Sequence, residues 1–303
     1  MLKVAIIGLG KIGLEYDLKK PSFYYHSHLK SLSCHKSFDI RALIDKNKNI
    51  LSLKILDTFN TYKNLDYLEE LDLDMIVIAV PTKYHLSIFN DICKKLKKVK
   101  YILFEKPVGQ NLSECEKIIK LSRKKKIKIY VNYIRNYQKN IINFFIRQGN
   151  INLNKINITK IFYTGSIINN CSHFISLIIK VYGESNIKNI SIIKKKYSKP
   201  INFYFEIKKN IFVFKFVEKK DKRVNTMKII NLENEIHLNS HNTFITIYNK
   251  KNKCIKKIKT EMEKYQLNVY DNIIRDITSS SDYVCDIKTA HQTHRIISRV
   301  LNA

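Results

Sequence analysis

Short apolar runs alternate with segments of helical periodicity over the first 133 residues. Runs rich in branched residues, of the buried-strand kind, lie at 3–7, 39–44, 74–80, 101–104 and 127–133. Helical segments are expected at about 84–97 and 112–125, the second beginning near Asn111 or Ser113, which are both good N-caps. Apolar strands that alternate with helices are typical of a parallel sheet covered on both faces. We therefore expect residues 1–133 to form an α/β Rossmann domain with a doubly wound parallel sheet.

The hydrophobic pattern changes after residue 133. It predicts helices at about 136–148, 170–182, 263–278 and 288–301, and a strand near 157–163. Between the second and third helices lie alternating segments of strand length, separated by polar clusters: ISIIKKK, INFYFEI, NIFVFKFV, TMKIINL, EIHLN, TFITIYN and CIKKIKT. We expect residues 134–303 to form an α+β domain, in which helices cover one face of an open, mainly antiparallel sheet.

Length and composition agree with a two-domain globular protein. The chain has 303 residues, 45% of them hydrophobic, and no apolar run reaches the roughly 18 to 20 residues of a membrane span. The amino-terminal apolar run is broken by glycines and lacks a cleavage site, so we expect a strand and a cytoplasmic protein. The six cysteines are scattered singly without a CxxC pair, which argues against zinc and against a disulfide framework.

The formal net charge of +29 raises the question of nucleic-acid binding. Only eight of the 55 basic residues are arginine, and the lysines are spread along the whole chain. The densest runs, at 94–100 and 123–128, fall at helix ends, where cations suit the helix dipole. We therefore expect no specific nucleic-acid partner. His26, His28 and His35 crowd a polar loop without a carboxylate cluster, so we also expect no metal.

A Gly8-x-Gly10-x-x-Gly13 motif follows the first strand and is expected to open a helix. Gly8 permits the tight turn, Gly10 lets the backbone approach a pyrophosphate, and Gly13 allows close packing of the helix. The phosphates would lie at the helix amino terminus, where unpaired N–H groups point outward. The chain has only seven glycines, so three at this spacing favour a cofactor loop over a plain tight turn. The residues predicted to bind the cofactor here are Gly8, Leu9, Gly10, Lys11, Ile12 and Gly13.

Asp45 ends the second predicted strand. A carboxylate at this place accepts both ribose hydroxyls and repels a 2′-phosphate, which favours NAD over NADP. The following Lys46 and Lys48 can still tolerate a 2′-phosphate, so NADP stays open as the alternative cofactor.

Five segments together resemble the Gfo/Idh/MocA family of sugar oxidoreductases: VAIIGLGKIG at 4–13, AVPTKYH at 79–85, EKP at 105–107, VNYIRNY at 131–137 and a glycine-led segment that ends in Ser172-His173. The resemblance implies a Rossmann domain, an open-sheet domain, and hydride transfer between NAD(P) and a carbon of a sugar, nucleotide sugar or cyclitol. By this match, Lys106 is the motif lysine that contacts substrate and nicotinamide ribose. The match also assigns to the cofactor site Pro81, Thr82, His85, Glu105, Lys106 and Asn132.

The family's last motif has an aspartate four residues before its histidine, and the matching positions here are Asn169 and His173. Histidine suits the removal of a hydroxyl proton because its pKa lies near neutrality. The family aspartate would orient the imidazole and raise its basicity, whereas Asn169 orients it without adding charge. A further aspartate that is frequent three residues after the histidine is Ser176 here.

Three interpretations follow from this difference. Lys106 and His173 still transfer the proton, with Asn169 as a neutral orienting residue; or the protein catalyses a modified reaction, such as reduction of a keto-sugar; or it is a catalytically inactive nucleotide-binding protein. We expect the first, with Arg135, Tyr163 and Asn170 contacting the substrate. The exposed sheet face predicts a homo-oligomer, and the resemblance alone suggests a role in surface polysaccharide synthesis.

Overall fold

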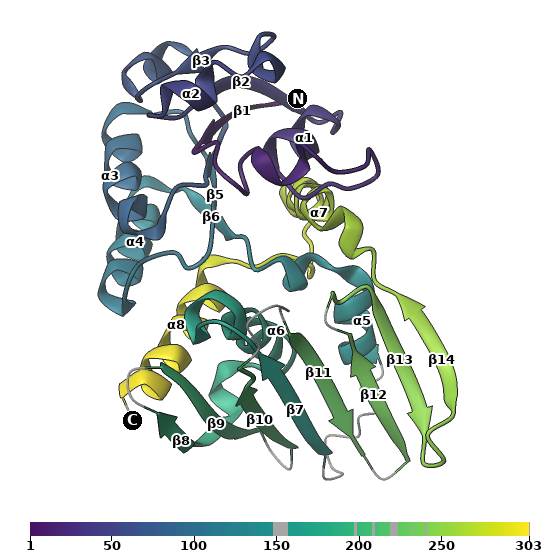
Figure 1. Ribbon diagram of the computed structural model, residues 1–303. Helices are drawn as coiled ribbons and strands as arrows, with labels where there is room; N and C mark the ends of the chain where they lie inside the picture. Colours follow the sequence, from purple (N-terminus) through teal and green to yellow (C-terminus); the bar gives the residue numbers. More distant parts are fainter. Residues whose placement is uncertain are drawn as a thin grey trace. The chain divides into compact units, whose positions relative to one another are not determined.

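The computed structural model describes residues 1–147, 157–196, 199–207, 210–218, 224–231, 233–239 and 241–302. The chain forms two compact units (Figure 1). Unit 1 comprises Met1–Asn132 and Glu263–His291, and unit 2 comprises Tyr133–Met262 and the chain from Gln292 onward. Within the described residues, no helix is long and apolar enough to cross a membrane, and no cluster of three or more His, Cys, Asp or Glu side chains has the arrangement of a metal site.

A six-stranded parallel sheet forms the centre of unit 1. Its strands are β1 (Leu2–Ile7), β2 (Phe38–Ile44), β3 (Thr61–Tyr62), β4 (Met75–Ile78), β5 (Tyr101–Phe104) and β6 (Lys128–Val131). They lie in the order β3-β2-β1-β4-β5-β6, which reverses between β1 and β4. Strand β4 is buried throughout and β1 is buried from Val4 to Ile7, as their apolar sequences predict. The expected doubly wound Rossmann sheet is confirmed.

Helices cover both faces of this sheet. Its main helices are α1 (His28–Ser33), α3 (His85–Lys95), α4 (Leu112–Lys125) and α7 (Tyr265–Thr278), beside the short α2 (Lys48–Leu51). Helices α3 and α4 pack together on one face, and α1 and α7 pack together on the other (Figure 1). Asn111 caps α4 as expected, since its side chain accepts from the Glu114 N–H. The short 3₁₀ turns of the chain are Glu15–Asp17, Lys54–Leu56, Asp66–Glu70, Thr82–Tyr84, Ile134–Tyr137, Glu184–Asn186 and Met262–Lys264.

The helix expected directly after Gly13 is interrupted. The loop makes one helical turn, in which Leu14 N–H donates to the Gly10 carbonyl at 2.9 Å, and the chain then departs as a long loop. It returns at α1, where the N–H groups of His28 and Leu29 donate to the carbonyls of Ile12 and Gly13, both at 2.9 Å. Helix α1 therefore continues the turn that the glycine loop begins, and the intervening residues are an insertion within one helix.

Residues 263–291 belong to unit 1, whereas the sequence analysis assigned all of 134–303 to the second domain. Two sets of contacts explain the difference. Helix α7 packs against α1, and the Val131 N–H at the end of β6 donates to the Cys285 carbonyl at 2.9 Å. The pattern of apolar residues marks these segments as helix and loop but does not reveal which sheet they join.

Unit 2 contains an eight-stranded sheet. The strands are β7 (Asn157–Tyr163), β8 (Ile187–Lys196), β9 (Lys199–Ile207), β10 (Asn210–Phe216), β11 (Asn225–Ile230), β12 (Asn234–Leu238), β13 (Phe244–Asn249) and β14 (Cys254–Lys259). They lie in the order β14-β13-β12-β11-β7-β10-β9-β8, antiparallel except for the parallel pair β7 and β10. The expected open, mainly antiparallel sheet is confirmed.

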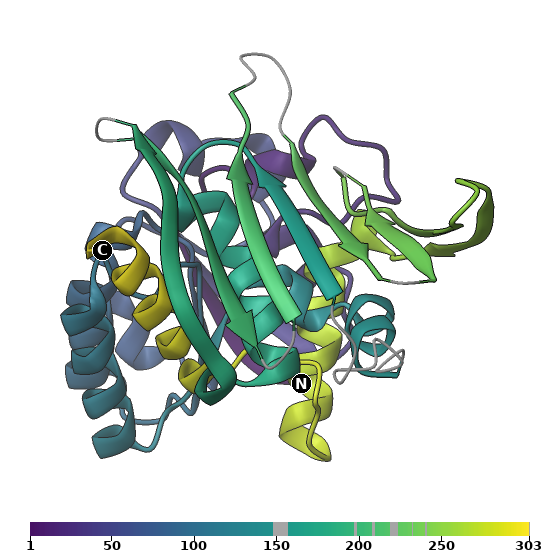
Figure 2. The ribbon, with the colours of Figure 1, turned by 90° about the horizontal axis from the view of Figure 1, so that it is seen from below.

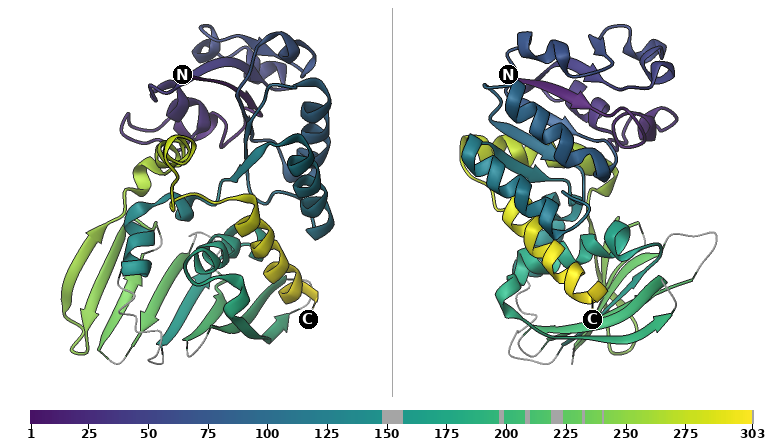
Figure 3. Two further views of the ribbon diagram at one scale, coloured as in Figure 1. Left: turned by 180° about the vertical axis from the view of Figure 1, so that it is seen from behind. Right: turned by 90° about the vertical axis from the view of Figure 1, so that its left-hand side faces the viewer.

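Helices lie on one face of this second sheet. They are α5 (Lys139–Arg147), α6 (Ser172–Tyr182) and the carboxyl-terminal part of α8 (Ile287–Asn302) (Figures 2 and 3). Side chains alternate accordingly, with Ile161 fully buried toward the helices and Ile158 38% exposed on the other face. Helix α6 ends at Gly183, whose φ of 79° matches its expected role after a helix end.

Candidate active site

The glycine loop lies at the carboxyl end of β1, and two of its glycines are required by close packing. A Cβ on Gly13 would lie 2.1 Å from the Gly8 carbonyl oxygen, and one on Gly8 would lie 2.8 Å from the Ala79 backbone. By contrast, a Cβ on Gly10 would meet no atom within 4 Å. The loop is thus packed on the inside and open at Gly10, where a phosphate can approach the backbone.

A cavity of about 630 Å³ lies beside this opening. It is lined by Gly8 and Gly10 after β1, Asp45 after β2, and Pro81 and Tyr84 after β4, so it stands at the switch point of the sheet, where α/β proteins bind ligands. In the described chain, no protein acceptor pairs with the loop N–H groups of Gly10, Lys11 and Ile12. Open backbone donors, a bare Gly10 and the cavity fit the phosphates and the adenosine half of a dinucleotide.

Asp45 holds the glycine loop and also lines the cavity. Its Oδ2 accepts from the Leu9 N–H at 2.7 Å and its Oδ1 accepts from the Asn47 N–H at 2.9 Å. A carboxylate has about four lone-pair positions, so Asp45 can still accept hydrogen bonds from a ribose. The remaining predicted loop residues lie as follows: Leu9 is buried, Ile12 is partly exposed, and Lys11 is exposed.

Two lysines flank Tyr84 in the lining of the cavity. The ammonium groups of Lys46 and Lys83 each lie 5.0 Å from the centre of the Tyr84 ring. The pKa of Tyr84 is lowered, first by its hydrogen bond with Lys83 and then by the charge of Lys46. These cations favour a phosphate-bearing ligand in general, so NADP stays open beside NAD.

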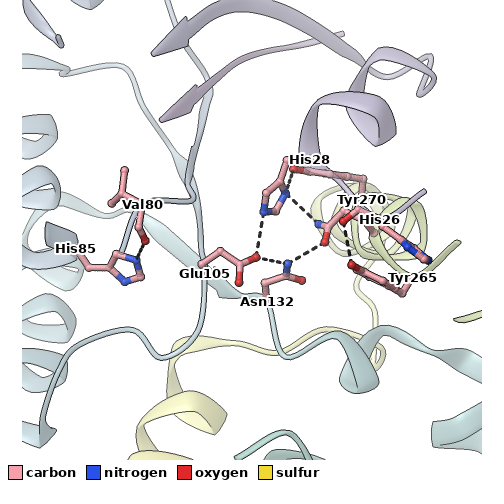
Figure 4. Close-up of polar contacts among 9 residues, drawn as sticks. His26, His28, Val80, His85, Glu105, Asn132, Tyr265 and Tyr270 are labelled. Atoms are coloured by element: carbon pink, nitrogen blue, oxygen red, sulfur yellow. Dashed lines mark hydrogen bonds and ion pairs between the residues drawn. The ribbon is translucent and has the colours of Figure 1, made fainter. Parts of the chain in front are cut away.

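The segment after β4 is fixed by a buried histidine. His85 is fully buried, and its ring nitrogens lie 2.9 Å from the Val80 carbonyl and 3.0 Å from the Val108 carbonyl (Figure 4). Burial lowers the pKa of His85, while the hydrogen bonds with the two carbonyls act in the opposite direction. His85 therefore ties the end of β4 to the loop after β5. Pro81 reaches the cavity, and Thr82 begins the 3₁₀ turn Thr82–Tyr84.

Glu105 and Lys106 follow β5, and the Lys106–Pro107 peptide bond is cis, a geometry that bonds preceding proline can adopt. Glu105 accepts from Asn132 Nδ2 at the end of β6 and lies 3.1 Å from His28 Nε2. Asn132 also donates to Gln266 Oε1 at 2.9 Å, and Gln266 Nε2 lies 3.0 Å from His28 Nδ1. The four side chains close a ring, to which Tyr270 adds its hydroxyl at 2.7 Å from His28 Nδ1 (Figure 4).

The position of His28 corrects the sequence analysis, which placed it on a polar loop. His28 is the first residue of α1 and is fully buried. Gln266 and Tyr270 were not predicted from the sequence, because they come from α7, far along the chain. Glu105 and Asn132 could be expected to meet, because adjacent parallel strands end at the same sheet edge. No signal in the sequence links that edge to α7.

The predicted histidine motif lies in unit 2, on a turn that differs from the expected one. A π-helical turn, Ile167–Cys171, precedes α6, so Asn169 lies in the wide turn and His173 in the first turn of the α-helix. Such π-turns are rare and often occur at functional sites. His173 is partly exposed and packs edge-on to the Tyr133 ring, with ring centres 5.6 Å apart. Asn169 is exposed.

The three residues expected to contact substrate have structural contacts in unit 2. Arg135 is 5% exposed, donates from Nε to Asn242 Oδ1 at 2.9 Å, and stacks on Phe174 at 4.3 Å. Burial lowers its pKa to about 10, so it remains charged at neutral pH. Asn170 donates to the Thr164 carbonyl, and Tyr163 is fully buried. Contact of any of these three with a substrate stays a prediction.

Unit 1 thus gathers the glycine loop, Asp45 and Pro81 around one cavity, and Glu105 and Asn132 in one hydrogen-bonded ring. Lys106 belongs to unit 1, whereas His173 and Asn169 belong to unit 2. Ser176, where the sequence resemblance leads one to expect a second aspartate, is buried and accepts from Asn136 Nδ2 at 2.9 Å.

Solved structures of the same fold cover nearly the whole chain. UDP-N-acetylglucosamine 3-dehydrogenase GnnA from Acidithiobacillus ferrooxidans is 13% identical, with a TM-score of 0.73 over 99% of this chain and 96% of that one. The dehydrogenase MviM from Clostridium difficile is 14% identical, with a TM-score of 0.76 over 99% of both. An Agrobacterium radiobacter oxidoreductase, solved with NAD⁺, L-tartaric acid and magnesium, is 12% identical, with a TM-score of 0.73 over 99% of this chain and 95% of that one. These likenesses support the fold.

No curated protein matches the sequence significantly. Residues 2–133 match the family model GFO_IDH_MocA, described as an oxidoreductase family with an NAD-binding Rossmann fold. The matched range contains the glycine loop, Asp45, Lys106 and Asn132. Over residues 2–133, all but the last of which lie within unit 1, the chain therefore matches the Gfo/Idh/MocA family of oxidoreductases through its NAD-binding Rossmann fold.

Proposed function

We propose that this protein transfers a hydride between a nicotinamide dinucleotide and a hydroxyl-bearing carbon of a sugar, nucleotide sugar or cyclitol. The observation that carries the proposal is the glycine loop at the sheet's switch point, open at Gly10 and adjoining a cavity of about 630 Å³. The substrate class is supported by the sequence resemblance and by one structural relative, which is named as a UDP-N-acetylglucosamine dehydrogenase.

The proposed chemistry divides between two side chains. The bound dinucleotide supplies the hydride acceptor or donor. His173 takes the hydroxyl proton of the substrate at a ring nitrogen, and Lys106 stabilises the developing alkoxide with its positive charge. Asn169, on the turn that leads into α6, orients the substrate or the imidazole without changing the charge. We propose NAD as the main cofactor because Asp45 opposes a 2′-phosphate, with NADP as the alternative.

A second candidate is a nucleotide-binding protein without catalysis. Two observations favour it: Asn169 stands where the family has an aspartate, and Ser176, where the family often has another, is engaged in a buried bond with Asn136. The imidazole of His173 then lacks a family carboxylate that would raise its basicity. A protein of this kind would bind NADH and show no turnover with any sugar.

A turnover assay with matched variants separates these candidates. Purified protein is offered NAD⁺ or NADH with a panel of nucleotide sugars, free sugars, cyclitols and their keto forms, and the absorbance of reduced nicotinamide is followed. With any substrate that turns over, Lys106→Ala and His173→Ala should each lower kcat by about 10²-fold or more, while NADH affinity persists. Unchanged turnover in His173→Ala would remove its role as the base.

If nothing in the panel turns over, Asn169→Asp decides between loss of catalysis and a missing substrate class. A nucleotide-binding protein without catalysis would gain no turnover in Asn169→Asp, whereas turnover gained there would support the role of His173, because the aspartate raises its basicity. A homo-oligomer, a cytoplasmic location and a role in surface polysaccharide synthesis accompany the proposal as predictions from the sequence.

A further inference from the structure

A closed ring of hydrogen bonds joins four separate elements of unit 1. His28 comes from α1, Glu105 follows β5, Asn132 follows β6, and Gln266 lies on α7. His28, Asn132 and Gln266 are all at least 99% buried. The ring stands at the carboxyl edge of the sheet and contains one carboxylate, that of Glu105 (Figure 4). Burying polar groups in this way is favourable only if every bond in the ring has a matching donor and acceptor.

The chemistry of the side chains fixes the direction of each bond. A carboxylate only accepts, so Asn132 must direct its amide nitrogen to Glu105, and the same nitrogen donates to Gln266 Oε1. Gln266 must then direct its own amide nitrogen to His28 Nδ1, which therefore accepts. The proton of the neutral imidazole lies on Nε2 and is donated to Glu105. The ring thus delivers two donors, from Asn132 and His28, to a single ionised carboxylate.

Glu105 also lies next to Lys106 in the chain. Burial by itself would raise the pKa of Glu105, but its hydrogen-bonding and electrostatic contacts with His28, the hydrogen bond with Asn132 and the charge of Lys106 lower it below the ordinary glutamate value. Burial raises the pKa of Tyr270 well above its usual range, so its phenol keeps the proton and shares the single lone pair of His28 Nδ1 with the Gln266 amide. A fixed negative charge therefore accompanies the positive charge of Lys106.

The Glu105 charge lies in the half of the sheet that would bind the nicotinamide half of the cofactor. Strands β1, β2 and β3 form the half that carries the glycine loop, Asp45 and the cavity. In a sheet of this order each half takes one mononucleotide, so β4, β5 and β6 take the nicotinamide half when the first half takes adenosine. The ring lies at the ends of β5 and β6. The oxidised nicotinamide ring carries a positive charge, and the reduced ring is neutral.

We propose that the ring of His28, Gln266 and Asn132 holds Glu105 as a fixed anion whose function is to let the oxidised cofactor bind beside Lys106. This inference rests on the proposed function. His28 is a positioning residue here, because it acts through Glu105. Without the Glu105 charge, Lys106 repels the pyridinium, and affinity shifts from NAD⁺ toward NADH. Because binding and redox equilibria are linked, the same ring sets the reduction potential of the bound cofactor.

The test compares the dissociation constants of NAD⁺ and NADH, measured by calorimetry, in the wild type and four variants. Glu105→Gln keeps the acceptor oxygen and removes the charge. His28→Leu removes the donor to Glu105, and His28→Gln restores a donor at about the same reach. The matched control is His35→Gln, which removes another histidine–carboxylate pair, 3.2 Å between His35 Nε2 and Asp271 Oδ1, beyond the end of α1. Thermal unfolding confirms that each variant folds.

The dissociation constant of NAD⁺ divided by that of NADH should rise about fivefold or more in Glu105→Gln. The same ratio should also rise in His28→Leu. It should stay near the wild-type value in His28→Gln and His35→Gln. A general loss of structure would weaken the binding of NAD⁺ and of NADH equally and leave the ratio unchanged. An unchanged ratio in Glu105→Gln, with both ligands still bound, would overturn this inference alone. Failure of the wild type to bind either ligand would overturn the proposed function as well. If His28→Leu does not fold, Glu105→Gln still decides.

Discussion

At the scale of single residues, the glycines of the loop have opposite surroundings. Gly13 packs against the Gly8 carbonyl, where no side chain fits, whereas Gly10 faces open space beside the cavity. An added methyl group should therefore have a different effect at each glycine. At Gly13 it lowers the stability of the fold, and at Gly10 it lowers the affinity for the ligand.

The pair Gly10→Ala and Gly13→Ala separates these effects. Gly13→Ala should lower the free energy of unfolding by about 1–3 kcal/mol, because the new Cβ would lie 2.1 Å from the Gly8 oxygen. Gly10→Ala should change it by less than about 0.5 kcal/mol, yet weaken NADH binding by about tenfold or more. Urea unfolding and a fluorescence titration measure the two quantities. Unchanged NADH affinity in Gly10→Ala would mean that phosphate does not approach the loop there.

Much of the unit 1 site could be predicted from the sequence, because its residues come directly after strands. Gly8, Asp45 and Pro81 each follow a strand, and parallel strands end at one edge. The bonds of Arg135 and Asn170 could not be predicted. Arg135 donates a hydrogen bond to Asn242, more than a hundred residues along the chain. Asn170 lies in a π-helical turn, whose geometry has no simple sequence pattern, and donates to the Thr164 carbonyl.

At the scale of elements, the return of the chain to unit 1 depends on a few polar contacts. Asp276 on α7 accepts from the Tyr130 hydroxyl at 2.7 Å and lies 2.7 Å from Lys128 Nζ, so it joins α7 to β6. Its side chain is only 9% exposed. Burial alone would raise the pKa of Asp276, but the contacts with Lys128 and Tyr130 lower it.

Asp276→Ala should therefore destabilise the protein by about 1–3 kcal/mol at neutral pH, because it leaves the Tyr130 hydroxyl without its partner. Because folding lowers the pKa of Asp276, its carboxylate stabilises the fold fully at pH values above about 3.9, the pKa of aspartate in an unfolded chain. This stabilisation is lost as the pH falls through the lower pKa of the folded state. The difference in the free energy of unfolding between Asp276→Ala and the wild type should stay constant down to about pH 5 and become smaller below about pH 4. Urea unfolding at several pH values measures it.

The control is Asp66→Ala, which removes an exposed ion pair with Lys95 and should cost less than about 0.5 kcal/mol. Equal costs for the two substitutions would contradict the role given to Asp276. The strands and most helices were predictable from periodicity, whereas the continuity of α1 with the turn after Gly13 was not. A loop leaves one helix and returns to it, and periodicity records only local neighbours.

At the scale of the whole molecule, the helix-free face of the unit 2 sheet predicts self-association. Ile158 on β7 lies between Ile211 on β10 and Ile230 on β11 in the register of the sheet, so three isoleucines form a stripe across that face. Ile158 is 38% exposed. An apolar stripe on a sheet face is typical of an interface.

Light scattering at micromolar concentration should give a mass above that of one 35.8 kDa chain. Ile158→Lys should lower it toward the monomer, because a charge would be buried in the interface. Ile55→Lys, a matched change at a 53% exposed position in unit 1, should leave it unchanged. A monomeric wild type would contradict this prediction.

The most direct test of the central claim is a titration of the purified protein with NADH and, separately, with NADPH, followed by fluorescence. The glycine loop, Asp45 and their cavity predict micromolar binding, with NADH preferred over NADPH. Binding of neither nucleotide up to the millimolar range would contradict the assignment of this site and, with it, the oxidoreductase proposal.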